Sequence, residues 1–188
     1  SKVILITTAI LIIAPAVFFF ACDFGNLPAG KRLLASVFQS VTTRTAGFNT
    51  EDLSTMSDAS QGVMILLMLI GGSPGSTAGG MKTTTFAVLI LNALATFRSR
   101  EDAGAFGRRF DGQVVKNAAT IAMMYFMLFF FGGITISVYE GLPLLTCLYE
   151  AASAVGTVGL TLGITPELHI ISRLILIALM YLGRVGGM

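Results

Sequence analysis

The chain has 188 residues, of which 54% are hydrophobic and only 12% are charged, and its mean hydropathy is +0.82. Water-soluble domains are about 45–50% apolar and about 25% charged, so this composition excludes a water-soluble globule and predicts an all-α membrane protein. The formal net charge is +2. We expect the surface of the protein to contact the lipid bilayer and not to bind nucleic acid.

The first predicted element is a membrane-spanning helix over residues 3–21, a run of 19 residues without a charge. At about 1.5 Å of rise per residue, such a run reaches roughly across the ~30 Å of a bilayer core. It lacks the small-residue cleavage site of a signal peptide and follows Ser1, not Met. We therefore expect the chain to begin inside a longer protein.

A turn signal and a short helix are predicted after the first span. Residues 26–30 carry the turn signal, and the next segment, of roughly 12 residues, is too short to span a bilayer. A non-spanning segment followed by a glycine-containing strand is typical of a re-entrant pore loop. The segment ends at the tetrapeptide Thr45, Ala46, Gly47 and Phe48.

The next helix is predicted to begin near Gly62 and to break after Ile70. Each Gly costs about 1 kcal/mol in a helix interior and Pro about 3 kcal/mol, so the residues that follow cannot stay helical. We expect a mobile loop deep in the membrane that gates a pore, and a helix again over residues 83–97. Lys82 closes this loop, either with a part in gating or by extending to the cytoplasmic interface. The predicted gate loop comprises Gly71, Gly72, Ser73, Pro74, Gly75, Ser76, Thr77, Ala78, Gly79, Gly80 and Lys82.

Charge placement predicts the orientation. Five of the twelve basic residues lie between Phe97 and Lys116, inclusive of Lys116, and by the positive-inside rule this segment faces the cytoplasm. We divide the chain into a pore repeat (1–97), a cytoplasmic linker (98–117) and a second pore repeat (118–188) that is truncated at its C-terminus. Seven of the ten acids fall on the outward segments, where they either attract cations or merely solvate loops. These acids are Asp23, Glu51, Asp52, Asp58, Glu140, Glu150 and Glu167.

The second repeat follows the same order. Residues 118–138 are a second uncharged span and residues 141–143 a turn signal. The final apolar run, residues 174–183, is short, so its prediction as a span depends on the repeat. Arg184 follows it, where a charge costs roughly 2.5–3.5 kcal/mol. We expect Arg184 either to face a cavity, as a barrier to a cation, or to lie at the membrane interface. The second short segment ends at Thr157, Val158, Gly159 and Leu160.

One offset of 112 residues aligns the two halves without a gap. It places the Thr45 tetrapeptide on the Thr157 tetrapeptide, and it also places Gly71 on Gly183. An internal repeat decides the architecture before any single motif does. The predicted fold class is therefore an all-α membrane protein with two helix, pore loop, helix repeats, like the units of K+ channels.

The chemistry expected of the two tetrapeptides is coordination of a dehydrated K+ ion by backbone oxygens. Glycine permits the backbone conformations that turn successive carbonyls the same way, and the C-terminal dipole end of each short helix attracts the cation. Arg44 is expected to turn away from the ion and to brace the loop, with Glu150 as the hypothetical partner. The predicted K+ ligands are the carbonyls of Thr45, Ala46, Gly47, Thr157, Val158 and Gly159.

Three segments, residues 40–50, 71–84 and 156–161 with 183–186, resemble the Ktr/Trk/HKT family of K+ transporters, closest to the Ktr membrane subunit. The resemblance covers essentially the whole chain and implies that these are the third and fourth units of a four-repeat pore. It also implies K+ uptake by a multi-pass protein in the plasma membrane of a bacterium. A homodimer, a cytoplasmic nucleotide-binding regulatory subunit and Na+ as a coupling or activating ion are further implications.

Alternative functions remain open at this stage. A Na+/K+-permeable relative or a simple K+ channel would use the same residues. An intramembrane serine protease would need a base near Ser73 or Ser76, and the only histidine, His169, is predicted on the other side of the membrane. A purely structural scaffold would leave the repeat and the broken helix unexplained.

Overall fold

The computed structural model describes residues 2–76, 78–99, 104–105 and 108–185. Thr77 of the predicted gate loop, Arg100 of the basic segment and Gly186 lie outside the described residues. The elements of the first half are α1 (Lys2–Cys22), η1 (Phe24–Asn26), α2 (Ala29–Thr42), η2 (Leu53–Thr55), α3 (Asp58–Leu69) and α4 (Thr83–Phe97). The elements of the second half are β1 (Gly104–Ala105), β2 (Arg108–Arg109), α5 (Gly112–Glu140), α6 (Leu144–Val155), η3 (Thr165–Glu167) and α7 (Ile170–Val185).

Both predicted spans are present as long helices. α1 has 21 residues and α5 has 29, and these are the two helices of the described residues that are long and apolar enough to cross a membrane. α5 begins at Gly112, inside the stretch assigned to the linker. The third apolar run lies in α7, which has only 16 residues. The fold is therefore helical, apart from the two-residue hairpin of β1 and β2.

Local sequence signals determine where the short helices begin and end. Pro28 and Pro143 occupy the positions just before α2 and α6, where a fixed φ and a missing N–H suit the start of a helix. α3 begins earlier than predicted, because the Ser57 hydroxyl accepts a hydrogen bond from the Ser60 amide at 3.3 Å and caps the helix. The predicted break is present, since helix stops at Leu69 and resumes at Thr83.

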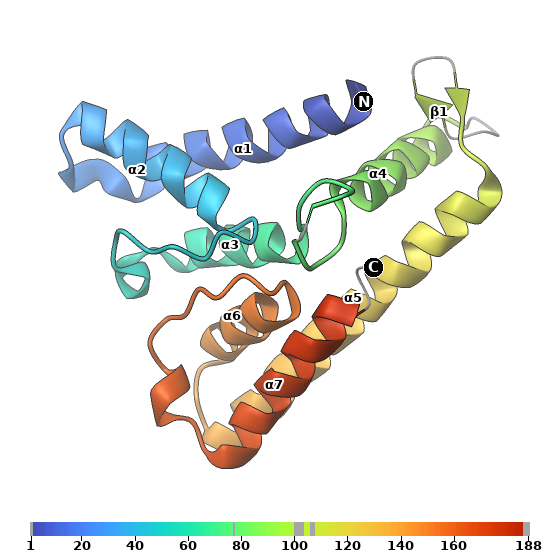
Figure 1. The fold of residues 1–188 in the computed structure, drawn as a ribbon. Coiled ribbons are helices and arrows are strands. Elements are labelled where there is room, and N and C mark those ends of the chain that lie inside the picture. The colour runs from blue at the N-terminus through green and yellow to red at the C-terminus, as the bar shows by residue number, and fades with distance from the viewer. Residues whose placement is uncertain (1, 77, 100–103, 106–107, 186–188) are drawn as a thin grey trace.

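The two halves interlock around α6. In each half the short helix packs against the preceding long one, α2 on α1 and α6 on α5, and α3 of the first half packs on α6 of the second. Figure 1 shows α6 enclosed between α3 on one side and the α5 and α7 pair on the other. Its side chains Cys147, Tyr149 and Val155 are fully buried. The shared core therefore places the loops after α2 and α6 next to each other.

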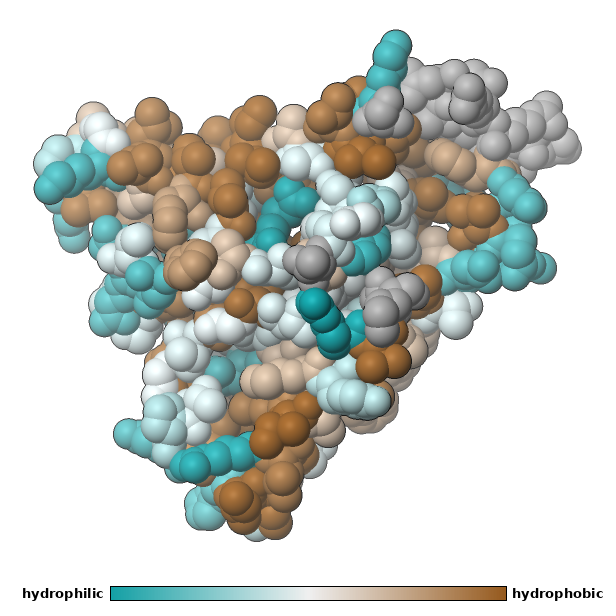
Figure 2. All heavy atoms as spheres, viewed as in Figure 1, coloured by the Kyte–Doolittle hydropathy of each residue, from teal (hydrophilic) through white to brown (hydrophobic). Residues whose placement is uncertain are grey.

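The outer faces of the long helices are apolar. Leu5, Ile13 and Val17 of α1 are more than half exposed, as are Phe131 of α5 and Ile177 of α7. Figure 2 shows hydrophobic residues spread over α1 and along the edge formed by α5 and α7. Exposed apolar surface of this extent suits contact with lipid or with further helices and not with water.

Candidate functional site

The two Thr-x-Gly loops, residues 45–48 and 157–160, share one unusual backbone conformation. Thr45 and Thr157 have φ of 72° and 53°, and Gly47 and Gly159 have φ of 73° and 93°. A left-handed threonine is strained, because its Cβ crowds the backbone. Two such residues at repeat-equivalent places indicate a conformation that the surrounding structure imposes and that a function requires.

The two loops touch each other. A Cβ added to Gly47 would overlap the carbonyl oxygen of Val158 and would lie 3.7 Å from the Cα of Gly159. Only glycine fits this contact, since the position needs both a positive φ and a close approach. Segments that are 112 residues apart in the sequence therefore meet at their glycines.

Each loop is fastened to its own short helix by a hydroxyl group. In the first half the Thr42 hydroxyl donates to the Phe48 carbonyl at 2.6 Å. In the second half the Gly159 amide donates to the Ser153 hydroxyl at 3.2 Å. The loops differ in their surroundings, because Phe48 is 71% exposed whereas Leu160 is 3% exposed.

Glu150 fastens the segment that follows the second loop. Its Oε1 accepts from the Thr161 hydroxyl at 2.6 Å and from the Leu162 amide at 2.9 Å, and its Oε2 accepts from the Thr165 hydroxyl at 2.9 Å. The residue is only 4% exposed. Glu150 is therefore not part of an outer acidic surface, as its place in the sequence had indicated, but an internal anchor.

The hypothesis that Arg44 pairs with Glu150 is wrong. The Arg44 Nη2 donates instead to the Gly71 carbonyl at 3.3 Å, and the Glu150 carboxylate is engaged by its own loop. Arg44 is also one of the residues that line a cavity beside the loops. The reason is positional: Arg44 lies just past the end of α2, where the first glycine of the broken helix presents a carbonyl to it.

The glycine-rich loop, residues 71–82, is closed at its base by backbone hydrogen bonds. The Gly71 amide donates to the Met81 carbonyl at 2.8 Å, and the Thr83 amide donates to the Gly72 carbonyl at 3.1 Å. Lys82 does not extend away from the loop. Its Nζ donates to the carbonyls of Ala78 at 2.6 Å and Ser76 at 3.3 Å. The base of the loop is therefore fixed, whereas Pro74, Gly75 and Ser76 at its tip are exposed.

The glycine-rich loop packs directly on the second Thr-x-Gly loop. A Cβ added to Gly79 would overlap the Oγ1 of Thr157 and crowd its Cγ2. The Thr157 Oγ1 is buried and has no hydrogen-bond partner among the described residues. An unpaired buried hydroxyl is costly, so this atom is available for a ligand at the junction of the two loops.

A polar cavity of about 390 Å³ lies at this junction. Its walls come from all three loops and from the last turn of α7. Two of the lining residues are arginines, Arg44 and Arg184. The lining residues are Arg44, Thr45, Gly72, Ser76, Ala78, Thr157 and Arg184. The structure therefore brings Arg184 together with both Thr-x-Gly loops and the glycine-rich loop.

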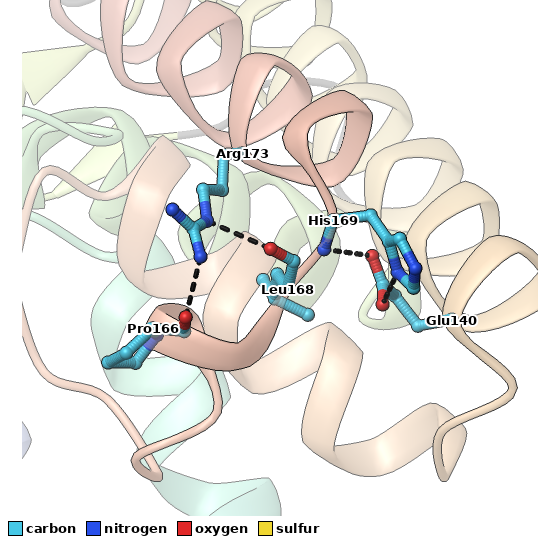
Figure 3. A network of polar contacts seen from close by, with 5 residues as sticks. All are labelled: Glu140, Pro166, Leu168, His169 and Arg173. Carbon is cyan, nitrogen blue, oxygen red and sulfur yellow. Dashed lines mark hydrogen bonds and ion pairs between the residues drawn. The ribbon is translucent and has the colours of Figure 1, made fainter.

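Two of the acids that were predicted to face outward fasten helix ends and are not left for cations. The Asp23 carboxylate accepts from the Ser57 amide at 3.0 Å and from the Ser60 hydroxyl. The Glu140 carboxylate accepts from the His169 amide at 2.9 Å and contacts the His169 Nδ1 at 2.8 Å (Figure 3). Asp52, on the outer loop, keeps exposed charge: hydrogen bonds from the Ser54 hydroxyl and amide hold its pKa below the ordinary value.

The residues that the sequence analysis missed are the anchors behind the second loop. Ser153, Thr161 and Thr165 were not singled out, and Glu150 was given the wrong partner. A signal for Glu150 was present, because it is the only charged residue in the apolar helix α6. A lone carboxylate in such a helix must find buried donors.

The fold and these loops define an all-α membrane transport protein. The chain is similar to the crystal structure of the potassium transporter TrkH from Vibrio parahaemolyticus, with a TM-score of 0.78 over 96% of this chain and 41% of that chain, at 21% identity. That likeness concerns the fold. The chain belongs to the TrkH family of cation transport proteins, whose family model matches residues 1–188.

Curated relatives are transport proteins and not enzymes. The potassium/sodium uptake protein NtpJ of Enterococcus hirae is 41% identical over the whole of this chain and 44% of its own length. The Ktr system potassium uptake protein B of Bacillus subtilis is 38% identical over 86% of this chain and 36% of its own length. The chain thus spans less than half of the relatives it matches. The intramembrane protease alternative finds no support among them.

Proposed function

We propose that the protein containing this chain takes up K+ across a bacterial plasma membrane, and that residues 1–188 supply two of its pore loops. The family membership and the uptake proteins among the relatives support the ion and the process. The observation that carries the proposal is the shared left-handed backbone of the two Thr-x-Gly loops, which meet at Gly47 and Val158.

In this proposal the backbone carbonyls of residues 45–47 and 157–159 replace the water around K+. Alternation of left-handed and ordinary residues turns successive carbonyls to one side, as a filter built from peptide oxygens requires. The C-terminal ends of α2 and α6 lie directly before the loops, so their dipoles add negative potential at the same place. Two further repeats, outside this chain, would complete the ring of oxygens.

The glycine-rich loop acts as the gate and Arg184 as a barrier. Gly79 lies against Thr157, so the loop in this position covers the inner end of the second pore loop. Arg44 and Arg184 line the cavity on the same side, and their charges oppose a cation that leaves the filter. Opening then requires the part of the loop around Gly79 to withdraw from Thr157, while the backbone hydrogen bonds of Gly71 with Met81 and of Thr83 with Gly72 hold the base.

The remaining components of the proposal concern the whole protein. A homodimer and a cytoplasmic nucleotide-binding subunit are proposed from the resemblance to the Ktr branch, and two relatives are named as parts of Ktr systems. Na+ is proposed as a coupling or activating ion. A Na+/K+-permeable protein is the second candidate, because one relative is named as a potassium/sodium uptake protein.

The test is cation flux through the intact parent protein in vesicles. We expect K+ and Rb+ to pass and Na+ to pass poorly, and we expect Gly159→Ser to lower the K+/Na+ flux ratio about tenfold, or about 1.4 kcal/mol of discrimination. Serine strains the left-handed backbone there and displaces carbonyls. Gly141→Ser is the matched control, since Gly141 has a left-handed φ of 70° and open space around it but lies in the turn between α5 and α6, away from the loop.

The outcomes separate the candidates. Equal K+ and Na+ flux through the unmodified protein would favour the Na+/K+-permeable alternative. An unchanged flux ratio in Gly159→Ser, or an equal change in Gly141→Ser, would overturn the assignment of the second loop as a filter.

A further inference from the structure

Glu150 is a buried carboxylate whose hydrogen bonds all come from uncharged groups of one segment. Its donors are the hydroxyls of Thr161 and Thr165 and the amide of Leu162. Burying a carboxylate is costly unless its oxygens are well satisfied. The buried charge of Glu150 thus serves to bind the segment that directly follows the second Thr-x-Gly loop.

Glu150 acts together with Ser153, which lies three residues further along α6. Residues three apart occupy the same face of a helix, and this face of α6 meets the back of the loop. Ser153 accepts from the Gly159 amide at 3.2 Å, and Glu150 accepts from Thr161 at 2.6 Å. One helix face therefore fixes the loop at two successive points, one at its glycine and one just beyond it.

The second Thr-x-Gly loop has room to move if the hydrogen bonds between Glu150 and the segment after the loop are lost. A cavity of about 450 Å³ adjoins the loop in this chain, and it is lined by residues of α6, by the loop itself and by Leu176 and Met180 of α7. Close-packed surroundings would hold the loop in place whatever Glu150 did. Because a cavity adjoins the loop, the position of the loop depends on the hydrogen bonds to the Glu150 carboxylate.

The first half of the chain has no counterpart of this arrangement. At the offset of 112, Glu150 corresponds to Phe38, Thr161 to Asn49 and Thr165 to Leu53. The first loop is instead held by the Thr42 hydroxyl on the Phe48 carbonyl. The two pore loops are therefore alike in backbone but unequal in support.

We propose that Glu150 is a positioning residue which fixes the outer end of the second pore loop, so that ion discrimination by the parent transporter depends on its carboxylate. This inference rests on the proposed function. Glu150 does not touch the ion path; it acts through Thr161, Leu162 and Thr165. Removing its acceptors lets residues 159–162 move into the cavity, which spoils the spacing of the loop carbonyls.

The test uses two kinds of variant in the intact parent protein. Glu150→Gln keeps the size of the side chain but removes one acceptor oxygen. Thr161→Val removes the hydroxyl donor at nearly constant shape, and Thr161→Ser keeps the hydroxyl and is its matched control. The readouts are the K+/Na+ flux ratio and the KM for K+, each measured at known amounts of folded protein in vesicles.

We expect Glu150→Gln and Thr161→Val each to lower the K+/Na+ flux ratio about tenfold, the factor associated with one hydrogen bond to a charged group. Both should raise the KM for K+, and Thr161→Ser should restore both values. A merely structural role would lower the yield of protein and the maximal flux but not the ratio. If Glu150→Gln does not fold, the two Thr161 variants decide alone.

Two failures are distinguishable. If the unmodified parent protein does not select K+, the proposed function fails. If it selects K+, and Thr161→Val keeps both the flux ratio and the KM, the proposed function stands and the role of Glu150 is overturned.

Discussion

Residue 79 must be glycine in this packing, because any Cβ there would overlap the side chain of Thr157. The contact joins the glycine-rich loop to the second pore loop at an atom, the Thr157 Oγ1, that has no hydrogen-bond partner among the described residues. Close contact without a hydrogen bond can be released at low cost. This pair of residues is therefore suited to the proposed gate, which would rest on the proposed filter and withdraw from it.

Gly79→Ala should force the glycine-rich loop away from Thr157. The added methyl group cannot be accommodated by a side-chain rotation at Gly79, so the loop itself must shift. We expect K+ flux through the parent protein to rise several-fold in vesicles. Gly75→Ala is the matched control, since that position has a left-handed φ of 84° but open space around it. A rise in both variants, or in neither, would contradict this role of the contact.

Single residues were predictable where the repeat marked them and not elsewhere. Gly47 and Gly159 stood out because two Thr-x-Gly tetrapeptides recur at one offset. The left-handed threonines did not, because nothing in residue type indicates that threonine will adopt a strained φ. Arg44 was assigned to Glu150 on charge alone, whereas its true acceptor is a backbone carbonyl that only the break after α3 exposes.

At the scale of elements, an acidic residue at the end of each long helix fastens the start of a later helix in the same half of the chain. Asp23, after α1, accepts from the Ser57 amide before α3, and Glu140, at the end of α5, accepts from the His169 amide before α7. Helix N-termini leave amides unpaired and attract negative charge. The two residues whose amides donate, Ser57 and His169, are 112 residues apart and match at the repeat offset. The two acids are 117 residues apart, so they play the same part in the structure although the offset does not align them.

Asp23→Ala and Glu140→Ala should each lower the thermal unfolding midpoint of the parent protein by about 2–4 °C, as expected for loss of one helix cap. Glu167→Ala, at an exposed acid of η3, is the control and should leave the midpoint unchanged. His169→Ala should cost less than Glu140→Ala, because the amide of residue 169 still reaches the carboxylate. Equal loss in the control would show a general charge effect and not capping. Differential scanning fluorimetry in detergent measures all four.

Elements were predictable from hydropathy and from helix breakers. The uncharged runs became α1 and α5, and ten small or helix-breaking residues separated α3 from α4 as expected. The start of α3 was placed four residues late, at Gly62 instead of Asp58, because the Ser57 cap was overlooked. The partners of Asp23 and Glu140 could not be predicted, because they depend on how antiparallel helices meet in space.

The whole molecule is polarised along the long helices. Lys116 lies near the start of α5, whereas Glu140 and Glu167 lie at its far end and in the adjoining loop. Figure 1 shows the hairpin and the start of α5 at one extreme of the molecule and the junction of α5 with α7 at the opposite one. Lys116 and these two acids are thus separated by nearly the full length of α5.

This polarity predicts the orientation in the cell, with the basic segment in the cytoplasm. Lys116 and Glu167 are both exposed, so cysteine at either position should react with a membrane-impermeant maleimide that can reach it. In a parent protein whose accessible cysteines, Cys22 among them, are replaced by Ser, we expect Glu167→Cys to be labelled in intact cells and Lys116→Cys only after permeabilisation. Cys147, which is fully buried, stays unlabelled in both and serves as the internal control. Labelling of Lys116→Cys in intact cells would invert the molecule and place the glycine-rich loop on the outer side of the Thr-x-Gly loops, where it could not gate release of K+ into the cell.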